Sequence, residues 1–283
     1  MTRTARVPRE SRDVTVRDVR LRVVEAGDPR APALVLVHGF LVSHTEFDDV
    51  IDDRAARFHV IAPDLAGFGE SAKPSAARWT YGIDAFAESV ADVIAAFDVG
   101  RASVLGHGMG GAVALTLAAR HAEVVSRLVL VDPLVYPVPR TRRLKLPLTP
   151  ILGPFFFKQL WGRGGFRAWF REDVFSADFP LPVERIDRWY DTFNAPSARE
   201  SAYAVLQAAL DVSPVVARLG RVGCPTLVVW GREDRMFPVT SATRLAREIR
   251  DARLHVFETG HAPHQEQPEL FVRVVTEFLE GRR

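Results

Sequence analysis

The sequence predicts an α/β protein in which a mostly parallel sheet carries helices on both faces. Short apolar runs alternate with segments of helical periodicity, which is typical of parallel strands joined by crossover helices. Some runs are apolar at every position, as in Ala33–Val37, and such strands are expected to be buried on both faces. The runs also end at turn-forming residues, such as His38-Gly39 and Pro63-Asp64.

Length and composition place the chain among ordinary globular proteins. Its 283 residues make one large domain or two small ones, at the usual size of about 100–200 residues each. Hydrophobic residues make up 47% and charged residues 25%, which excludes a disordered chain, a collagen-like fibre and a disulfide-dense module. The net charge of +2 gives no basis for a nucleic-acid partner.

Neither a membrane partner nor export is expected. The apolar run Ala31–Val37 is far shorter than the roughly 18 residues that cross a bilayer. The N-terminus lacks the apolar segment of a signal peptide. Cys224 is the only cysteine, so no intrachain disulfide can form. We therefore expect a cytoplasmic protein.

The first part of the chain supplies most of the expected sheet. Val19–Glu25 alternates apolar and polar residues, which is typical of an edge strand with one solvated face. The other elements expected before residue 134 are the strands Ala33–Val37, His59–Ala62, Ser103–Leu105 and Arg127–Val131 and the helices Asp84–Phe97 and Met109–His121.

Residues 134–212 interrupt this alternation. They are 79 of 283 residues but hold 14 of the 27 aromatic side chains, and they contain no clear strand. A small helical insertion needs large side chains for its core, and ligand pockets are also mostly apolar and aromatic. We expect a helical cap over the sheet that serves both purposes.

After residue 212 the alternation resumes. The expected strands are Pro225–Trp230 and Leu254–Phe257, and the expected helices are Pro238–Ile249 and Pro268–Leu279. The chain is therefore expected to form one core from residues 1–133 and 213–283, with residues 134–212 inserted as the cap.

The segment around Gly108 is the most informative for function. A strand runs into Gly106-His107-Gly108-Met109-Gly110, and a helix rich in Ala and Gly follows at once. This resembles the nucleophile elbow, G-x-S-x-G, of the α/β-hydrolase fold family, in the strand–turn–helix setting that the motif requires. Gly106 and Gly110 leave room for the sharp turn. The apex residue is the family's nucleophile, usually serine, and here it is Gly108.

Further motifs match the same family in chain order. His38-Gly39-Phe40 resembles the oxyanion loop, and residues 63–71 resemble the turn after the fourth strand. Asp234 stands at the position of the family's acid, and His261 at that of its base. The resemblance implies a mostly parallel sheet of eight strands and a dyad in which Asp234 orients His261.

The resemblance also implies an oxyanion hole made by the backbone amides of Phe40 and Met109. Asp132 also ends a strand and is the reserve candidate for the acid. Ser43, which follows the oxyanion loop, is a weaker candidate for a substitute nucleophile.

Several candidate residues have structural interpretations as well. Asp234 could cap the helix near Pro238, and His261 could be a surface histidine. His264 and His107 are expected to pack in the structure, and Cys224 is expected to be a small buried hydrophobic residue. Asp234 and His261 are favoured for the site because they stand in register with the other motifs.

Glycine at position 108 cannot form an acyl-enzyme. Removal of the nucleophile from a serine protease costs about 10⁶-fold in kcat and leaves roughly 10³–10⁴-fold over water. Glycine does suit the apex, because a strained positive-φ conformation costs other residues about 1–3 kcal/mol. An efficient acyl-serine hydrolase is therefore excluded for this sequence.

Three functions remain open. The first is an enzyme in which His261 and Asp234 act on water or substrate directly, without an acyl-serine intermediate. Its substrate would be a small hydrophobic ester, lactone or ketone, and its chemistry hydrolysis, C–C cleavage, a lyase reaction or oxygenation. The second is a ligand-binding pseudoenzyme, and the third is a serine hydrolase whose nucleophile has been replaced.

Neither a metal nor a cofactor is expected. The sequence contains no H-E-x-x-H and no C-x-x-C. It also lacks a G-x-G-x-x-G after a strand, since the glycines at 108, 110 and 111 are spaced too closely. The expected partner is a small hydrophobic ligand with a carbonyl group.

Overall fold

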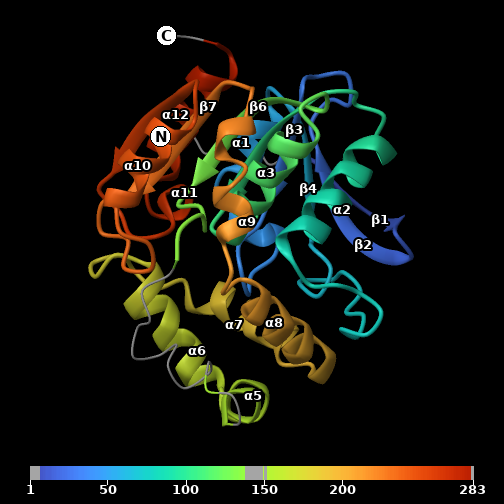
Figure 1. The fold of residues 1–283 in the computed structure, drawn as a ribbon, viewed down its shortest axis with the longest axis vertical. Coiled ribbons are helices and arrows are strands. Elements are labelled where there is room, and N and C mark those ends of the chain that lie inside the picture. The colour runs from blue at the N-terminus through green and yellow to red at the C-terminus, as the bar shows by residue number, and fades with distance from the viewer. Residues whose placement is uncertain (1–6, 138–148, 150–151, 282–283) are drawn as a thin grey trace.

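A single eight-stranded sheet forms the centre of the computed structural model, which describes residues 7–137, 149 and 152–281 (Figure 1). Its strand order is β1-β2-β4-β3-β5-β6-β7-β8. The strands are β1 (Arg9–Val16), β2 (Val19–Ala26), β3 (Ala33–Val37), β4 (His59–Pro63), β5 (Ala102–His107), β6 (Val125–Val131), β7 (Thr226–Gly231) and β8 (Ala252–Phe257).

The pairing of the strands confirms a mostly parallel sheet. β2 pairs antiparallel with both β1 and β4, and all other neighbours are parallel. The seven strands expected from the sequence are present, with ends shifted by up to two residues. The parallel strands place their carboxyl ends at one edge of the sheet, where ligands usually bind in open α/β folds.

The edge of the sheet differs from the sequence-based expectation. β1 was not expected, because its sequence RESRDVTV is mostly charged and its side chains are mostly exposed. It forms by pairing with β2 through the turn Arg17-Asp18, whose two positive φ values (49° and 62°) are typical of a tight hairpin. β1 is therefore the edge strand, and β2 lies inside the sheet.

Both faces of the sheet are covered, as its apolar strands predict. Along β3, Val35 and Val37 face a core shared with α2 and α3, whereas Leu34 and Leu36 face a second core shared with α1 and α12. The helices outside residues 134–212 are η1 (His44–Phe47), α1 (Ile51–Ala55), α2 (Ile83–Ala96), α3 (Met109–Arg120), α9 (Ser213–Val216), η4 (Leu219–Arg221), α10 (Thr240–Glu248), α11 (Pro263–Glu266) and α12 (Pro268–Leu279).

The described residues from 134 to 212 are helical wherever they form regular structure. These helices lie together beyond one end of the sheet (Figure 1). They are α5 (Leu152–Phe155), η2 (Phe156–Leu160), α6 (Arg163–Trp169), η3 (Phe170–Val174), α7 (Val183–Phe193) and α8 (Pro196–Ala208). We call the described residues from 134 to 212 the helical segment.

Aromatic side chains form the core of the helical segment. Phe166 is fully buried, and its ring lies 5.3–6.3 Å from five other aromatic rings. Arg199 is also buried, and its guanidinium donates to the carbonyl oxygens of Phe157 and Trp161 and to the side chain of Asn194. The aromatic excess in the sequence is therefore used, at least in large part, for packing within the segment.

No single helix among the described residues is long and apolar enough to span a bilayer. One pair, Pro196–Ala208 with Ser213–Arg221, passes a length and composition test together, but it is bent by 58°. Much of this pair is packed against the core, since Ala202, Val205 and Val215 are buried there.

Candidate active site

The turn between β5 and α3 has the sharp geometry that its glycines predict. Gly108 has φ +53° and ψ −114°, and its amide donates to the carbonyl of Val131. A Cβ atom on Gly106 would stand 2.2 Å from the Gly110 carbonyl oxygen, and one on Gly110 would stand 2.1 Å from the Val37 carbonyl oxygen. Only glycine fits at positions 106 and 110, so the start of α3 can pack directly on β5 and β3.

His261 and Asp234 form a hydrogen-bonded dyad. Nδ1 of His261 lies 2.8 Å from Oδ2 of Asp234, and both side chains are buried. Oδ1 of Asp234 accepts from the amides of Met236 and Phe237 at 2.7 and 2.9 Å, so this carboxylate also caps its own turn. The capping and dyad interpretations of Asp234 are thus compatible, because each uses a different oxygen.

The free nitrogen of His261 faces Gly108. A Cβ atom on Gly108 would stand 3.2 Å from Nε2 of His261. Because the Asp234 carboxylate accepts a hydrogen bond from Nδ1–H, a neutral ring carries its lone pair on Nε2. The structure therefore places a potential general base beside the position where the family carries its nucleophile.

The loop after β3 is fixed from behind by His38. Its Nδ1–H donates to the Gly39 carbonyl at 2.7 Å, and its Nε2 accepts from the Leu65 amide at 2.9 Å. Burial lowers the pKa of His38, which agrees with a neutral ring that donates once and accepts once. Among the described residues, the amides of Phe40 and Met109 make no hydrogen bond to a carbonyl or side chain.

Asp132, the reserve acid, does not contact His261 through a hydrogen bond. Its Oδ1 accepts from the Gly231 amide at 2.9 Å. Its side chain lies beside Asp234, because one carboxylate oxygen from each and a His261 nitrogen lie within 4.8 Å of one another. Burial, and then the negative charge of Asp234, raises the pKa of Asp132 well above its usual value. Burial and the charge of Asp234 therefore disfavour the ionised form of Asp132, whose Oδ2 has no hydrogen-bond partner among the described residues.

This arrangement predicts a pH-dependent effect of Asp132→Asn on stability. The folded-state pKa of Asp132 is raised, so its contribution to stability is full below about 3.8, the value in an unfolded chain, and is lost as the pH rises toward the folded value. We expect the melting temperature of the unmodified protein to fall relative to that of Asp132→Asn between pH 5 and pH 8. Calorimetry on both proteins measures this difference.

Asp98→Asn is the matched control, because Asp98 also has a positive φ (51°, against 42° for Asp132). Its melting temperature should follow that of the unmodified protein at every pH. A constant difference between Asp132→Asn and the unmodified protein across this range would contradict a neutral Asp132.

The remaining candidates have structural roles. The Ser43 hydroxyl caps η1, where it accepts from the Thr45 amide at 3.4 Å and bonds the Thr45 hydroxyl at 2.8 Å. Cys224 is buried, and burial raises the pKa of its thiol. Neither residue is placed to act as a nucleophile beside Nε2 of His261.

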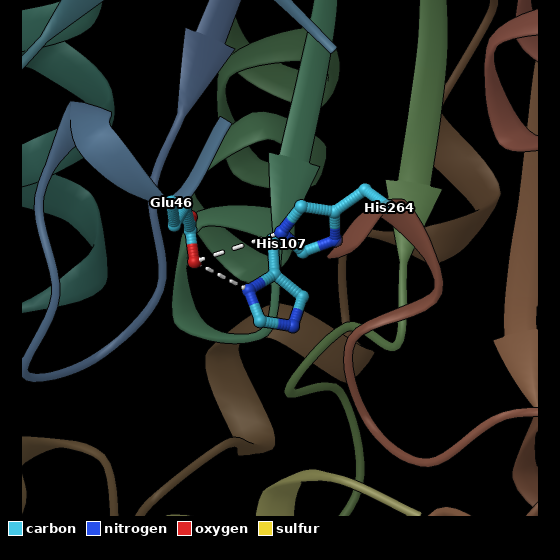
Figure 2. Close-up of side chains that lie close together, drawn as sticks. All are labelled: Glu46, His107 and His264. Atoms are coloured by element: carbon cyan, nitrogen blue, oxygen red, sulfur yellow. Dashed lines mark hydrogen bonds and ion pairs between the residues drawn. The ribbon is translucent and has the colours of Figure 1, made fainter. Parts of the chain in front are cut away.

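Sequence patterns gave no sign of one further cluster, which consists of Glu46, His107 and His264 (Figure 2). All three side chains are buried, and Nδ1 of His107 lies 2.9 Å from Oε2 of Glu46. Three such groups could hold a metal ion by distance alone, as could Asp132, Asp234 and His261. A metal on His107 would have to displace a hydrogen bond, because Nδ1 faces Glu46 and Nε2 faces the His261 carbonyl.

Comparison with known proteins supports the fold. The family model described as alpha/beta hydrolase fold matches residues 32–268. A 2-hydroxymuconate semialdehyde hydrolase of Pseudomonas sp. (strain CF600) is 29% identical over 284 residues, covering 96% of this chain and 94% of the relative. A 2-hydroxy-6-oxo-6-phenylhexa-2,4-dienoate hydrolase of Burkholderia cepacia is 31% identical over 241 residues, covering 80% of this chain and 78% of the relative.

A solved structure also supports the fold. The structure of a serine hydrolase involved in carbazole degradation superimposes with a TM-score of 0.80 at 26% identity. The match covers 97% of this chain and 100% of that chain. The similarity therefore includes both the sheet and the helical segment.

Proposed function

The chain belongs to the alpha/beta hydrolase fold family, and from this premise we propose that it is a hydrolase without an acyl-enzyme intermediate. His261 would act as general base and Asp234 would orient it. The observation that carries the proposal is the unbonded Nε2 of His261, which faces the side-chain position at Gly108 from 3.2 Å. A water molecule in that space could take the place of a serine hydroxyl.

The proposed reaction is direct hydrolysis of a carbonyl compound. Nε2 of His261 takes one proton from water while the water oxygen bonds to the carbonyl carbon, whose π electrons move to the carbonyl oxygen. The amides of Phe40 and Met109 would donate to that oxygen. When the intermediate collapses, the bond to the leaving group breaks, and the leaving group takes the proton back from Nε2.

Asp234 stabilises the imidazolium that forms during this reaction. Its Oδ2 accepts a hydrogen bond from Nδ1–H of His261, with 2.8 Å between the two heavy atoms. This bond fixes both the tautomer and the direction of the ring. The ring is also held by the edge of Phe237, at 5.0 Å between centroids. These contacts require no serine, so glycine at position 108 leaves them intact.

We propose a small hydrophobic ketone as the preferred member of the ester, lactone and ketone class. One relative is named as a hydrolase of 2-hydroxymuconate semialdehyde, and another as a hydrolase of 2-hydroxy-6-oxo-6-phenylhexa-2,4-dienoate. A hydrolase that acts on the 6-oxo group of such a compound breaks a carbon–carbon bond. The enol proton would first move from the 2-hydroxyl to C5, which gives the 2,6-dioxo tautomer. When water then attacks the 6-oxo carbon and the C5–C6 bond breaks, the carbanion left at C5 is delocalised onto the 2-oxo oxygen as a dienolate, which takes up the proton held by Nε2.

We also propose that the helical segment acts as a cap over the site. Trp189 of α7 donates to the Thr45 hydroxyl at 2.8 Å, and Arg185 of α7 pairs with Asp49 at 2.5 Å, so α7 lies directly on the loop after β3. A cavity of about 10 Å³ lies between that loop and α7 and α8. It has room for about one water molecule, and its lining belongs to this contact with the cap and includes neither Gly108 nor His261.

The direct test is turnover in isotopically labelled water. The unmodified protein is incubated with 2-hydroxy-6-oxo-6-phenylhexa-2,4-dienoate in H₂¹⁸O, and the conjugated chromophore is followed together with the mass of the products. We expect loss of the chromophore, one ¹⁸O in the benzoate formed, and no protein adduct in the mass spectrum of the intact chain. Heat-denatured protein is the control for spontaneous hydrolysis.

Other outcomes select the alternatives. Saturable binding of the dienoate without any product would favour a ligand-binding protein. Turnover of an activated ester but not of the ketone would move the substrate to the ester class. A covalent adduct on the unmodified chain would contradict direct attack by water.

A further inference from the structure

Glu46 lies in η1 and connects two parts of the candidate site. Its Oε1 accepts from the Gly39 amide at 2.8 Å, which fixes the loop that carries Phe40. Its Oε2 lies 2.9 Å from Nδ1 of His107, the residue just before Gly108 (Figure 2). The Glu46 side chain is fully buried, and its Oε2 also lies 4.0 Å from Nε2 of His264.

His107 extends the connection to the loop that carries the base. Its Nε2 lies 2.8 Å from the carbonyl oxygen of His261. With Glu46 ionised, both ring nitrogens face acceptors, a carboxylate and a carbonyl. A neutral imidazole has one N–H and can serve only one of them, whereas an imidazolium donates to both.

The surroundings favour the imidazolium. Burial lowers the pKa of His107, but the charge and hydrogen bond of Glu46, followed by the His261 carbonyl and the charge of Asp234, raise it above its ordinary value. His264, whose ring lies 4.7 Å from that of His107, does not compete for the proton. Burial lowers the pKa of His264 well below its ordinary value, so it stays neutral beside the cation.

We propose that Glu46 and His107 form a buried ion pair that positions the oxyanion loop and the His261 loop relative to each other across Gly108. The effect of this ion pair on catalysis rests on the proposed function, whereas the ion pair and its contacts with the two loops do not. Glu46 holds the first loop through Gly39, and His107 holds the second through the His261 carbonyl. His107 and Glu46 are positioning residues that act through these two loops, and the His107 ring lies 4.8 Å from the ring of His261.

The chain supplies a matched control in His59. Its Nε2 lies 2.6 Å from Oε1 of Glu25, which makes a second histidine–glutamate pair, with a buried histidine and a half-buried glutamate, at the β2–β4 pairing. Nδ1 of His59 has no partner among the described residues. His59→Gln therefore breaks a similar pair that bridges no loops of the site.

The first measurement needs no variant and no substrate. Nitrogen-15 NMR of the unmodified full chain, labelled at histidine, reports how many protons each ring carries. We expect the His107 ring to keep protons on both nitrogens well above pH 6.5 and to lose this property in Glu46→Gln. Burial lowers the pKa of His44, but its hydrogen bond to Asp64 and the Asp64 charge raise it above its ordinary value, so the His44 signal should stay the same in that variant. If every histidine ring carries a single proton at pH 7.5, the ion pair does not exist.

The second measurement tests the connection between the loops. In His107→Gln, hydrogen–deuterium exchange should become at least about tenfold faster in residues 38–47 and in residues 258–263 together, as expected when a buried hydrogen-bonded partner is lost. In His59→Gln, both loops should exchange as in the unmodified chain. Faster exchange in only one loop, or the same change in His59→Gln, would overturn the positioning role.

The catalytic effect is measured separately. In Glu46→Gln and His107→Gln we expect kcat on the dienoate to fall by about tenfold or more with KM nearly unchanged, because the loops would no longer hold the base and the amides in place. If the unmodified chain has no turnover, the proposed function fails, while the NMR and exchange results still decide the ion pair. If turnover is present and kcat is unchanged in both variants, the positioning role is wrong.

Discussion

Replacing Gly108 by serine is expected to give this chain a covalent intermediate. A Cβ atom at position 108 stands 3.2 Å from Nε2 of His261, so a serine hydroxyl one bond further can reach the base. The Asp234 contact and the free amides of Phe40 and Met109 are already present. With 4-nitrophenyl acetate we expect a burst of nitrophenol equal to the enzyme concentration and an acetyl adduct in the mass spectrum.

The size of this effect should be large. Loss of the serine nucleophile in a comparable hydrolase costs about 10⁶-fold in kcat. Restoring it beside an assembled dyad should recover a substantial part of that factor for an activated ester. A serine variant that folds but remains unreactive would show that the chain is not a serine hydrolase that has merely lost its nucleophile.

The same variant should be less stable than the unmodified protein. Gly108 has φ +53°, where a residue with a side chain is strained by about 1–3 kcal/mol. In chains somewhat smaller than this one, each kcal/mol of lost stability lowers the melting temperature by roughly 2–4 °C. The melting temperature of Gly108→Ser should therefore fall by several degrees. Gly223→Ser is the control, because nothing lies within 4 Å of a Cβ there. A higher melting temperature for Gly108→Ser would refute the strain argument.

Replacing His261 by alanine is expected to remove turnover while leaving the fold and ligand binding largely intact. A positioned general base contributes about 10²–10⁴-fold, and this variant should lose a factor of that size in kcat on any substrate that the unmodified chain turns over. The remaining dyad member, Asp234, keeps its hydrogen bonds to the amides of Met236 and Phe237, so its turn should persist.

The measurement separates an enzyme from a binding protein. Turnover is followed by product formation, and ligand affinity by calorimetric titration of the intact dienoate into each protein. His255→Ala is the control, since His255 lies on β8, where its ring contacts Phe257. Equal turnover by His261→Ala and the unmodified chain would exclude His261 as the base. A change in affinity without any turnover in either protein would favour the pseudoenzyme.

Local sequence was enough to predict the parts of the sheet that are buried on both faces. Ala33–Val37 and the glycines at 106 and 110 determine their environment directly, because an apolar run needs two covered faces and a residue without Cβ permits backbone contact. β1 could not be predicted in this way. Its charged residues become a strand only because β2 offers a free edge after the Arg17-Asp18 turn.

The candidate dyad was predictable because each of its members follows a buried strand within a short motif. The sequence alone determined the α/β class, the order of Gly108, Asp234 and His261 along the chain, and the absence of a side chain at the elbow. Only the tertiary structure decided that Asp234, rather than Asp132, holds His261, and that Glu46 lies against His107. Glu46 and His107 are separated by 61 residues, and a hydrogen bond over that distance depends on the packing of β3, β5 and η1, which no local pattern records.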